Sequence, residues 1–340
     1  MHDSADLRSA VKPYEQPSVP ASLFQLLNSV GLFIGACALM YWSLQLSYFL
    51  TLLLAVPTGG LLVRVFIIQH DCGHGSFFAN KWANDLVGRL CSVLTLTPYA
   101  NWRRQHAHHH ATWNNLDKRD SGADIYSACM TVVEYKALTR WQRFLHRLPR
   151  HPFLAHVVLP PLVFLFLYRF PFDTPREWGK ERRAVYWLNG ALVAAIGALG
   201  FQVGFVPVLL VQLPVIMVTT IIGGWLFAVQ HRFDASRWLR QTQWTFAGAS
   251  LEGSSYLQLP KILQWFTGNI GFHHVHHFAP RVPNYRLERC YRSIGGLQEK
   301  SPLKLRAALA AIGLTLWDED RQCLVRFKDV YSPELSSCAA

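Results

Sequence analysis

The stretch LSYFLTLLLAVPTGGLLVRVFIIQHDCGHGSF, residues 46–77, decides the fold. Residues 46–69 are almost entirely apolar, and a helix that crosses a bilayer needs about 20 such residues. The run ends in His70 and His74, whose spacing places both imidazoles on one face of a helix. Polar groups beside lipid at the end of a span are costly, so they are functional by default. We therefore predict a membrane helix with functional histidines at its rim.

The rest of the chain has the composition of a membrane protein. Of its 340 residues, 51% are hydrophobic, and the mean hydropathy is +0.14. A weaker apolar stretch lies near 86–100. Besides residues 46–69, long apolar stretches lie at about 24–43, 154–170, 184–205 and 206–229. These runs predict several membrane spans.

Eleven of the fifteen histidines gather in four places. They are His70 and His74; His106, His108, His109 and His110; His231; and His273, His274, His276 and His277. Spacings of three and four within these groups put imidazoles on one helix face, as convergent ligands require. Isolated histidines, such as His146, His151 and His156, are more often hydrogen-bonded core residues.

The clustered histidines predict a metal site. Neutral imidazole suits zinc, copper, iron or nickel. A zinc site takes about three or four protein ligands, whereas nine of these histidines stand at ligand spacings or just past a span. The sequence therefore predicts two metal ions. The cysteines are scattered without a CxxC pair, so a thiolate zinc site is not expected.

Whether the number of spans between the histidine clusters is even or odd decides which apolar stretches cross the membrane. Histidine clusters that share one site have to lie on one side of the membrane, and five spans would separate them. The stretch 154–170 is short, and Pro160 and Pro161 disrupt a helix in its middle. We therefore place this stretch in the membrane interface, together with the stretch 86–100, which carries Arg89.

The predicted fold is an all-α integral membrane protein with four transmembrane helices in two hairpins, interfacial helices and a cytoplasmic helical cap that carries the metal site. Residues 1–22, which contain three prolines, are expected to form a flexible arm. Residues 23–290 form the predicted membrane domain, and residues 291–340 a cytoplasmic C-terminal region. The predicted spans are about 24–43, 46–69, 184–205 and 206–229.

The formal net charge of +12 comes from basic residues in the polar segments between the apolar runs. No basic recognition helix or RNA-binding motif accompanies them, so nucleic acid is not an expected partner. The positive-inside rule places these segments, both termini and the histidines on the cytoplasmic side. An acidic electron carrier would also suit this surface. The expected location is a bacterial inner membrane.

The histidine motifs resemble those of the membrane fatty acid desaturase family, which are HxxxH, HxxHH and HxxHH with a further histidine after the last span. The resemblance covers most of residues 45–290. Within that family, the surrounding sequence is similar to the acyl-lipid delta-12 (omega-6) branch. The segments that carry this similarity are HDCGHGSF at 70–77, WR before His106, QH at 230–231, GNIGFH at 268–273 and PNY at 283–285.

The resemblance implies a set of metal ligands. His108 and His274 occupy variable positions of the motifs and are expected to support the ligands or face solvent. Asp71 and Asp117 either orient a ligand imidazole or are simply solvated. The implied ligands are His70, His74, His106, His109, His110, His231, His273, His276 and His277.

The resemblance further implies two non-haem Fe²⁺ ions that use O2 and two electrons to remove two hydrogens from adjacent methylenes of a lipid acyl chain. An unactivated C–H bond offers the protein no acid, base or leaving group, so the metal–oxygen centre supplies the oxidising power and the protein supplies position. The expected product carries a cis double bond at delta-12 of an oleoyl chain. The sequence lacks a His-Pro-Gly-Gly haem motif, so a separate donor such as ferredoxin is expected.

Five aromatic residues flank the histidine motifs and either line an acyl tunnel or pack in the core. They are Phe77, Phe78, Trp102, Trp225 and Phe272.

Other functions fit parts of this pattern. Related di-iron enzymes that hydroxylate acyl chains or modify carotenoids share the motifs, and product analysis separates them. A histidine-rich membrane metal transporter or sensor also joins spans to imidazoles, but a transporter places polar ligands near the middle of its spans. A haem-binding electron carrier needs only about two to four histidines and would show a Soret band.

Overall fold

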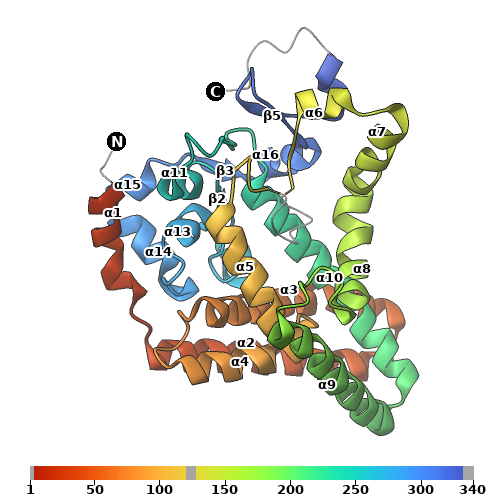
Figure 1. Ribbon diagram of the computed structural model, residues 1–340. Coiled ribbons are helices and arrows are strands. Elements are labelled where there is room, and N and C mark those ends of the chain that lie inside the picture. The colour runs from red at the N-terminus through yellow and green to blue at the C-terminus, as the bar shows by residue number, and fades with distance from the viewer. Residues whose placement is uncertain (1–3, 120–127, 332–340) are drawn as a thin grey trace.

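The computed structural model describes residues 4–119 and 128–331 and is mainly helical. The long helices occupy the lower part of Figure 1, with strands and short helices above them, to the left and, as α7 (Arg140–Arg147) and α8 (Leu159–Leu165), along the right-hand side. Four helices are long and apolar enough to cross a membrane. They are α2 (Val19–Ser43), α3 (Tyr48–His74), α9 (Gly179–Val203) and α10 (Phe205–His231). The predicted all-α membrane fold with four spanning helices is confirmed.

The four helices form two hairpins that meet at α3. Gly204 joins α9 to α10 with a φ of 92°, a left-handed conformation that glycine adopts without strain. Helix α3 contacts α2 and α10 and is the most buried of the four. At its contact with α10, a Cβ on Gly59 would lie 2.6 Å from the Val218 side chain. Glycine thus allows these two helices to approach closely, as small residues do between membrane helices.

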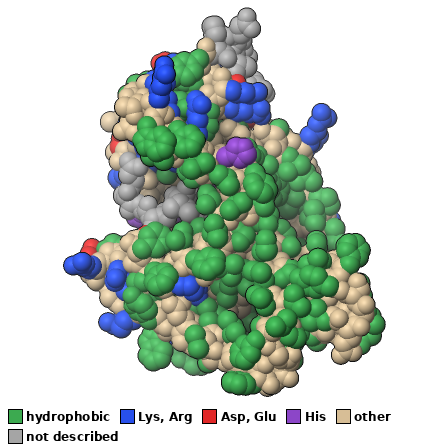
Figure 2. Space-filling view, turned by 90° about the vertical axis from the view of Figure 1, so that its right-hand side faces the viewer, with side chains coloured by type: hydrophobic (Ala, Val, Ile, Leu, Met, Phe, Trp, Pro, Cys, Tyr) green, Lys and Arg blue, Asp and Glu red, His purple; other side chains and the backbone are tan. Residues whose placement is uncertain are grey.

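Large apolar side chains cover the outer faces of these helices. Phe24, Phe49, Trp187 and Phe201 are each at least 70% exposed. Contact of so much apolar surface with water would be unfavourable, whereas lipid accommodates it. Figure 2 shows a broad area of hydrophobic side chains over the lower part of one face, with many of the Lys and Arg side chains near its top. This distribution matches a protein embedded in a bilayer.

The two stretches predicted to lie in the interface are both helical. Residues 86–100 belong to α4 (Lys81–Thr95) and the start of α5 (Tyr99–Thr112). Residues 154–169 form a π-helical turn, α8 (Leu159–Leu165) and a 3-10 turn. With the preceding helix they make a pair bent by 47°, which fits a broken span or a re-entrant loop. Their interfacial placement stays a prediction.

The remaining elements lie around the cytoplasmic end predicted for α3 and α10. Two small sheets, which the all-α prediction did not include, hold part of this region together. One sheet joins β1 (Met130–Thr131), β4 (Leu316–Asp318) and β5 (Cys323–Val325), and the other pairs β2 (Tyr256–Gln258) with β3 (Pro302–Lys304). The short helices are α6 (Val132–Ala137), α7 (Arg140–Arg147), α11 (Phe246–Leu251), α12 (Lys261–Phe266), α13 (His273–Phe278), α14 (Asn284–Ser293), α15 (Gly295–Gln298) and α16 (Leu305–Ala310).

The N-terminal segment differs from the flexible arm that the sequence analysis expects. Residues 4–11 form helix α1 (Ser4–Val11), followed by a 3-10 turn. Leu7 and Val11, one helical turn apart, are buried in a core that α13 and α14 also enter. The Arg8 guanidinium lies 5.1 Å from the centre of the Phe278 ring and donates to the Phe278 carbonyl. Burial of one apolar face therefore orders a segment that its prolines alone did not predict.

Candidate metal centre

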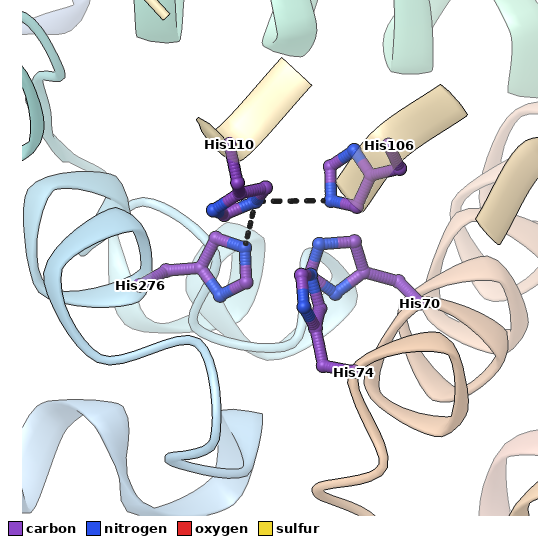
Figure 3. A group of neighbouring side chains, drawn as sticks. All are labelled: His70, His74, His106, His110 and His276. Carbon is purple, nitrogen blue, oxygen red and sulfur yellow. Dashed lines mark hydrogen bonds between the residues drawn. The ribbon is translucent and has the colours of Figure 1, made fainter. Parts of the chain in front are cut away.

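The first group of histidines comes from three helices and is drawn in Figure 3. It consists of His70 and His74 of α3, His106 and His110 of α5, and His276 of α13, with one nitrogen of each ring within 4.8 Å of the others. His110 Nε2 lies 3.2 Å from His106 Nε2 and 3.1 Å from His276 Nε2. Nitrogens bound at about 2.1 Å to one metal ion lie about 3.0–3.4 Å apart. The spacing of this group therefore fits ligation of an ion.

The second group adjoins the first. His109, His231 and His277 bring ring nitrogens within 4.8 Å of one another. His231 Nε2 is 3.1 Å from His109 Nε2 and 3.1 Å from His273 Nε2, so His273 belongs to the same group. The rings of His110 and His277 stack at 4.1 Å between centres. The structure thus brings all nine predicted ligands into two neighbouring groups.

Helix geometry explains how a few helices serve both groups. On α5, His106 and His110 are one turn apart and face the first group, whereas His109 faces the second. On α13, His276 faces the first group and His277 the second. A shift of either helix would therefore change both groups together.

Glycines set the end of α3 and its approach to α5. Gly75 has a φ of 68° and ends the helix directly after His74. A Cβ on Gly73 would lie 2.8 Å from the Trp102 ring. Without that Cβ, Trp102 can stack on His106, with ring centres 4.6 Å apart and an interplanar angle of 16°. The glycines of HDCGHG thus position both His74 and His106.

The protonation of the rings suits a metal ion. Burial and neighbouring imidazoles hold the pKa of His106, His110 and His276 well below the usual value. A neutral imidazole has one N–H, so hydrogen bonds alone leave lone pairs facing one another in such a group. Among the described residues, His74 Nε2 and His277 Nε2 are buried without a hydrogen-bond partner. A cation between the rings would bind these lone pairs.

Asp71 connects the first group to the C-terminal half of the chain. Its Oδ1 lies 3.3 Å from His70 Nδ1, and its Oδ2 accepts hydrogen bonds from Asn284 N at 2.6 Å and Asn284 Nδ2 at 2.8 Å. Gln25 of α2 exchanges two further side-chain hydrogen bonds with Asn284. A carboxylate that holds a ligand imidazole in this way fixes its orientation. The sequence analysis proposed Asp71 for this position but missed Asn284 and Gln25, because hydrogen bonds between distant segments leave no local pattern.

We expect Asp71→Asn to lower metal affinity and activity by about 10- to 100-fold, since partners of ligand imidazoles have effects of that size. The new amide would place an N–H donor against the donors of Asn284, and this costs about 1–3 kcal/mol of stability. Metal retained after dialysis against a chelator and the rate of product formation measure the effect. The matched control is Asp117→Asn, and a comparable loss in that variant would contradict the assignment.

Asp117 and the two histidines at variable positions lie outside both groups. Asp117 is exposed, and its carboxylate accepts hydrogen bonds from Arg240 Nη1 and Gln241 N at 2.8 Å each. Asp117 is therefore paired with Arg240 and does not orient a ligand imidazole. His274 is buried, with Nε2 3.0 Å from the Leu297 carbonyl oxygen, and burial lowers its pKa to about 4. His108 is partly exposed on α5.

An apolar cavity of about 160 Å³ borders both groups. His106 and His109 contribute to its wall, one from each group. Most of its other lining residues come from four helices and include Val63 and Phe66 of α3, Trp102 of α5, Val163 and Phe164 of α8, and Gly223, Gly224 and Phe227 of α10. Thr95 of α4 and residues 167–173, among them the polar Asp173, complete the wall. An apolar ligand in this cavity would lie against the histidine centre.

The five aromatic residues that flank the motifs separate in the structure. Trp102 lines this cavity, whereas Trp225 lines a different one. Phe77 and Phe78 belong to the core around α3, and Phe272 belongs to the core around α13. Phe227 and two glycines of α10 line the cavity instead, and the histidine motifs did not predict them.

Comparisons with known proteins agree with this geometry. The family model described as "Fatty acid desaturase" matches residues 21–307. The chain is 44% identical over 329 residues to a protein of Bacillus subtilis (strain 168) named "Fatty acid desaturase", a match that covers 97% of this chain and 92% of that protein. It is 28% identical to an "sn-1 oleoyl-lipid 12-desaturase" of Picosynechococcus sp., over 79% of this chain and 75% of the relative. An "sn-1 acyl-lipid omega-3 desaturase (ferredoxin)" of Synechocystis sp. is also 28% identical, over 85% of this chain and 79% of that relative.

Proposed function

This chain belongs to the fatty acid desaturase family, and from that premise we propose that it introduces a cis double bond into the acyl chains of membrane lipids by means of two non-haem iron ions. The observation that carries the proposal is the convergence of nine imidazoles in two adjoining groups beside an apolar cavity. The first group would hold one ion and the second group the other. Membership of this family argues against the metal transporter, the sensor and the haem carrier.

The chain's own residues would position the substrate and the metals. When bound, the iron ions together with O2 and two electrons supply the oxidising power that an unactivated C–H bond requires. The cavity between α3, α5, α8 and α10 would hold the acyl chain against the walls formed by His106 and His109. Apolar side chains such as Phe66 and Phe227 exclude water there and restrict the methylenes to a few orientations. The depth to which the chain enters would select the carbon atoms that react.

The finer part of the proposal is the delta-12 position on an oleoyl chain. Its support is the similarity to a relative named for oleoyl-lipid 12-desaturation and the motif surroundings described above. The omega-3 relative is equally similar, which makes product analysis the decisive measurement.

Electron supply and sidedness complete the proposal. A relative whose name includes ferredoxin supports a separate ferredoxin as the donor. We further propose that the metal centre and both termini face the cytoplasm of a bacterial cell, because basic residues are concentrated in the segments on that side of the spans.

The proposal is tested by gas chromatography and mass spectrometry of fatty acids from oleate-fed cells that express this protein with a ferredoxin system. We expect linoleate, with no such peak from cells that carry the empty vector. A double bond at another carbon would keep the desaturase and overturn the delta-12 position. Hydroxylated chains would favour the hydroxylase alternative, and unchanged lipids from iron-loaded protein would overturn the substrate class.

A further inference from the structure

A second cavity, of about 460 Å³, lies on the other side of α10 from the apolar cavity that borders the histidines. Its walls come from residues 149–159, the last two turns of α10 with the following Arg232, the C-terminal segment 308–315 and Ala128. Its polar lining residues are Arg150, His156, Trp225, Arg232 and Thr315. None of them is among the nine histidines.

Several buried polar atoms at this cavity make no hydrogen bond within the described part of the chain. The atoms are Arg150 Nε, Trp225 Nε1, Thr315 Oγ1 and His156 Nδ1. Arg150 Nε and Trp225 Nε1 are donors and the Thr315 hydroxyl can donate, whereas the His156 ring donates to the Ile312 carbonyl, which leaves a lone pair on its Nδ1. Buried donors without a partner are rare in folded proteins, since each loses its hydrogen bond to water without replacement. Their concentration around one cavity indicates a ligand that accepts hydrogen bonds.

Arg150 also brings positive charge to the cavity. Arg150 donates through Nη1 to the His146 carbonyl at 3.0 Å, and no carboxylate of the described residues lines the cavity. Burial and the neighbouring Arg232 lower the pKa of Arg150 to about 10, so this guanidinium remains charged at neutral pH. Burial raises the pKa of the nearby Cys129 thiol to about 11, and this thiol therefore supplies no counter-charge. Arg150 is partly exposed, and no carboxylate of the described residues compensates its charge at the cavity, so an anion would be attracted there.

We propose that this cavity binds an oxyanion of the phosphate class. Guanidinium, indole and hydroxyl groups together offer several donors to a tetrahedral anion with oxygens on all sides, and arginine is well suited to phosphate. The cavity lies beside the end of α10, where the apolar span gives way to polar residues. Both a phospholipid headgroup and free phosphate reach such a depth.

The test uses the purified, iron-loaded full chain in detergent. Native mass spectrometry measures binding of dioleoylphosphatidylglycerol, with dioleoylglycerol as the lipid that lacks the phosphate. Thermal unfolding measures stabilisation by inorganic phosphate. We expect Arg150→Gln to weaken phosphate-dependent binding by at least about tenfold, and Thr315→Val by a smaller factor. Arg140→Gln is the matched control, because Arg140 is exposed and lies at the start of α7 outside the cavity.

The outcomes separate the two sources of phosphate. Binding of the phospholipid that inorganic phosphate does not displace identifies a headgroup site, and stabilisation by inorganic phosphate alone identifies a site for the free anion. Either result supports the proposal if Arg150→Gln weakens that binding by about tenfold or more and Arg140→Gln does not. Equal binding by Arg150→Gln and the unaltered protein overturns it, as does the absence of binding by both probes.

A second readout distinguishes a binding role from a structural one. Without phosphate or anionic lipid, Arg150→Gln removes a partly buried charge that no carboxylate of the described residues compensates, so its unfolding temperature should equal or exceed that of the unaltered protein. With the ligand present, only the unaltered protein should gain stability. An equal fall in unfolding temperature under both conditions would show that Arg150 serves packing alone and would overturn the proposal.

Discussion

Replacing His276 by alanine is expected to reduce desaturation by more than about 100-fold and to remove about one metal ion per chain. His276 Nε2 lies 3.1 Å from His110 Nε2 in the first group, and no other side chain of α13 enters that group. Loss of a ligand lowers metal affinity and activity more than loss of a group that orients a ligand, and the latter already lowers them by about 10- to 100-fold. Metal analysis of the purified protein and product formation by the same preparation measure both effects.

His274→Ala is the control for this prediction. It removes another buried imidazole of α13, but that imidazole lies near the Leu297 carbonyl, outside both groups. We expect a milder variant that keeps its metal and loses about 1–3 kcal/mol of stability. Full activity in His276→Ala, or the same metal loss in both variants, would contradict the assignment of ligands.

Gly223→Phe is expected to lower turnover of 18-carbon chains by at least about tenfold while metal content stays unchanged. Gly223 lines the apolar cavity, and a Cβ added there meets no atom within 4 Å. The new ring would therefore extend into the cavity without displacing the backbone of α10, and it would occupy volume that the acyl chain needs. Neighbouring Gly224 is unsuitable for this test because its Cβ would lie 2.9 Å from the Pro160 ring.

The comparison variant for Gly223→Phe is Gly197→Phe. Gly197 lies on α9, where a Cβ also meets nothing within 4 Å, and it does not line the cavity. Metal analysis, thermal unfolding and product profiles of the two variants separate blockage from misfolding. Unchanged turnover and product distribution in Gly223→Phe would show that the acyl chain lies elsewhere.

The sequence predicted the spanning helices and the meeting of the histidines because both depend on strong local patterns. A long apolar run has few alternatives to a membrane helix, and spacings of three and four fix one face of that helix. The parity argument then required His70 and His276 to lie on one side of the membrane, and the structure places their ring centres 4.4 Å apart.

What the sequence did not reveal depends on tertiary contacts. Leu7 and Val11 become buried only because α13 and α14 are there to cover them. Asp71 and Asp117 look alike in the sequence, and their roles diverge because Asn284 reaches one carboxylate and Arg240 the other. The two small sheets consist of strands of two or three residues, which are too short to show an alternating pattern.

The three helices of the first group have a consequence for biosynthesis. His70 and His74 end the second spanning helix, whereas His276 and Asn284 come from the last quarter of the chain. A nascent chain can therefore insert its first hairpin long before it can close the metal centre. Until residues 273–284 have left the ribosome and docked, the rim of the inserted hairpin presents only incomplete sets of imidazoles. Chains that stop before residue 273 should thus reach the membrane yet fail to mature, and loading of the proposed metal centre would be a late step in assembly.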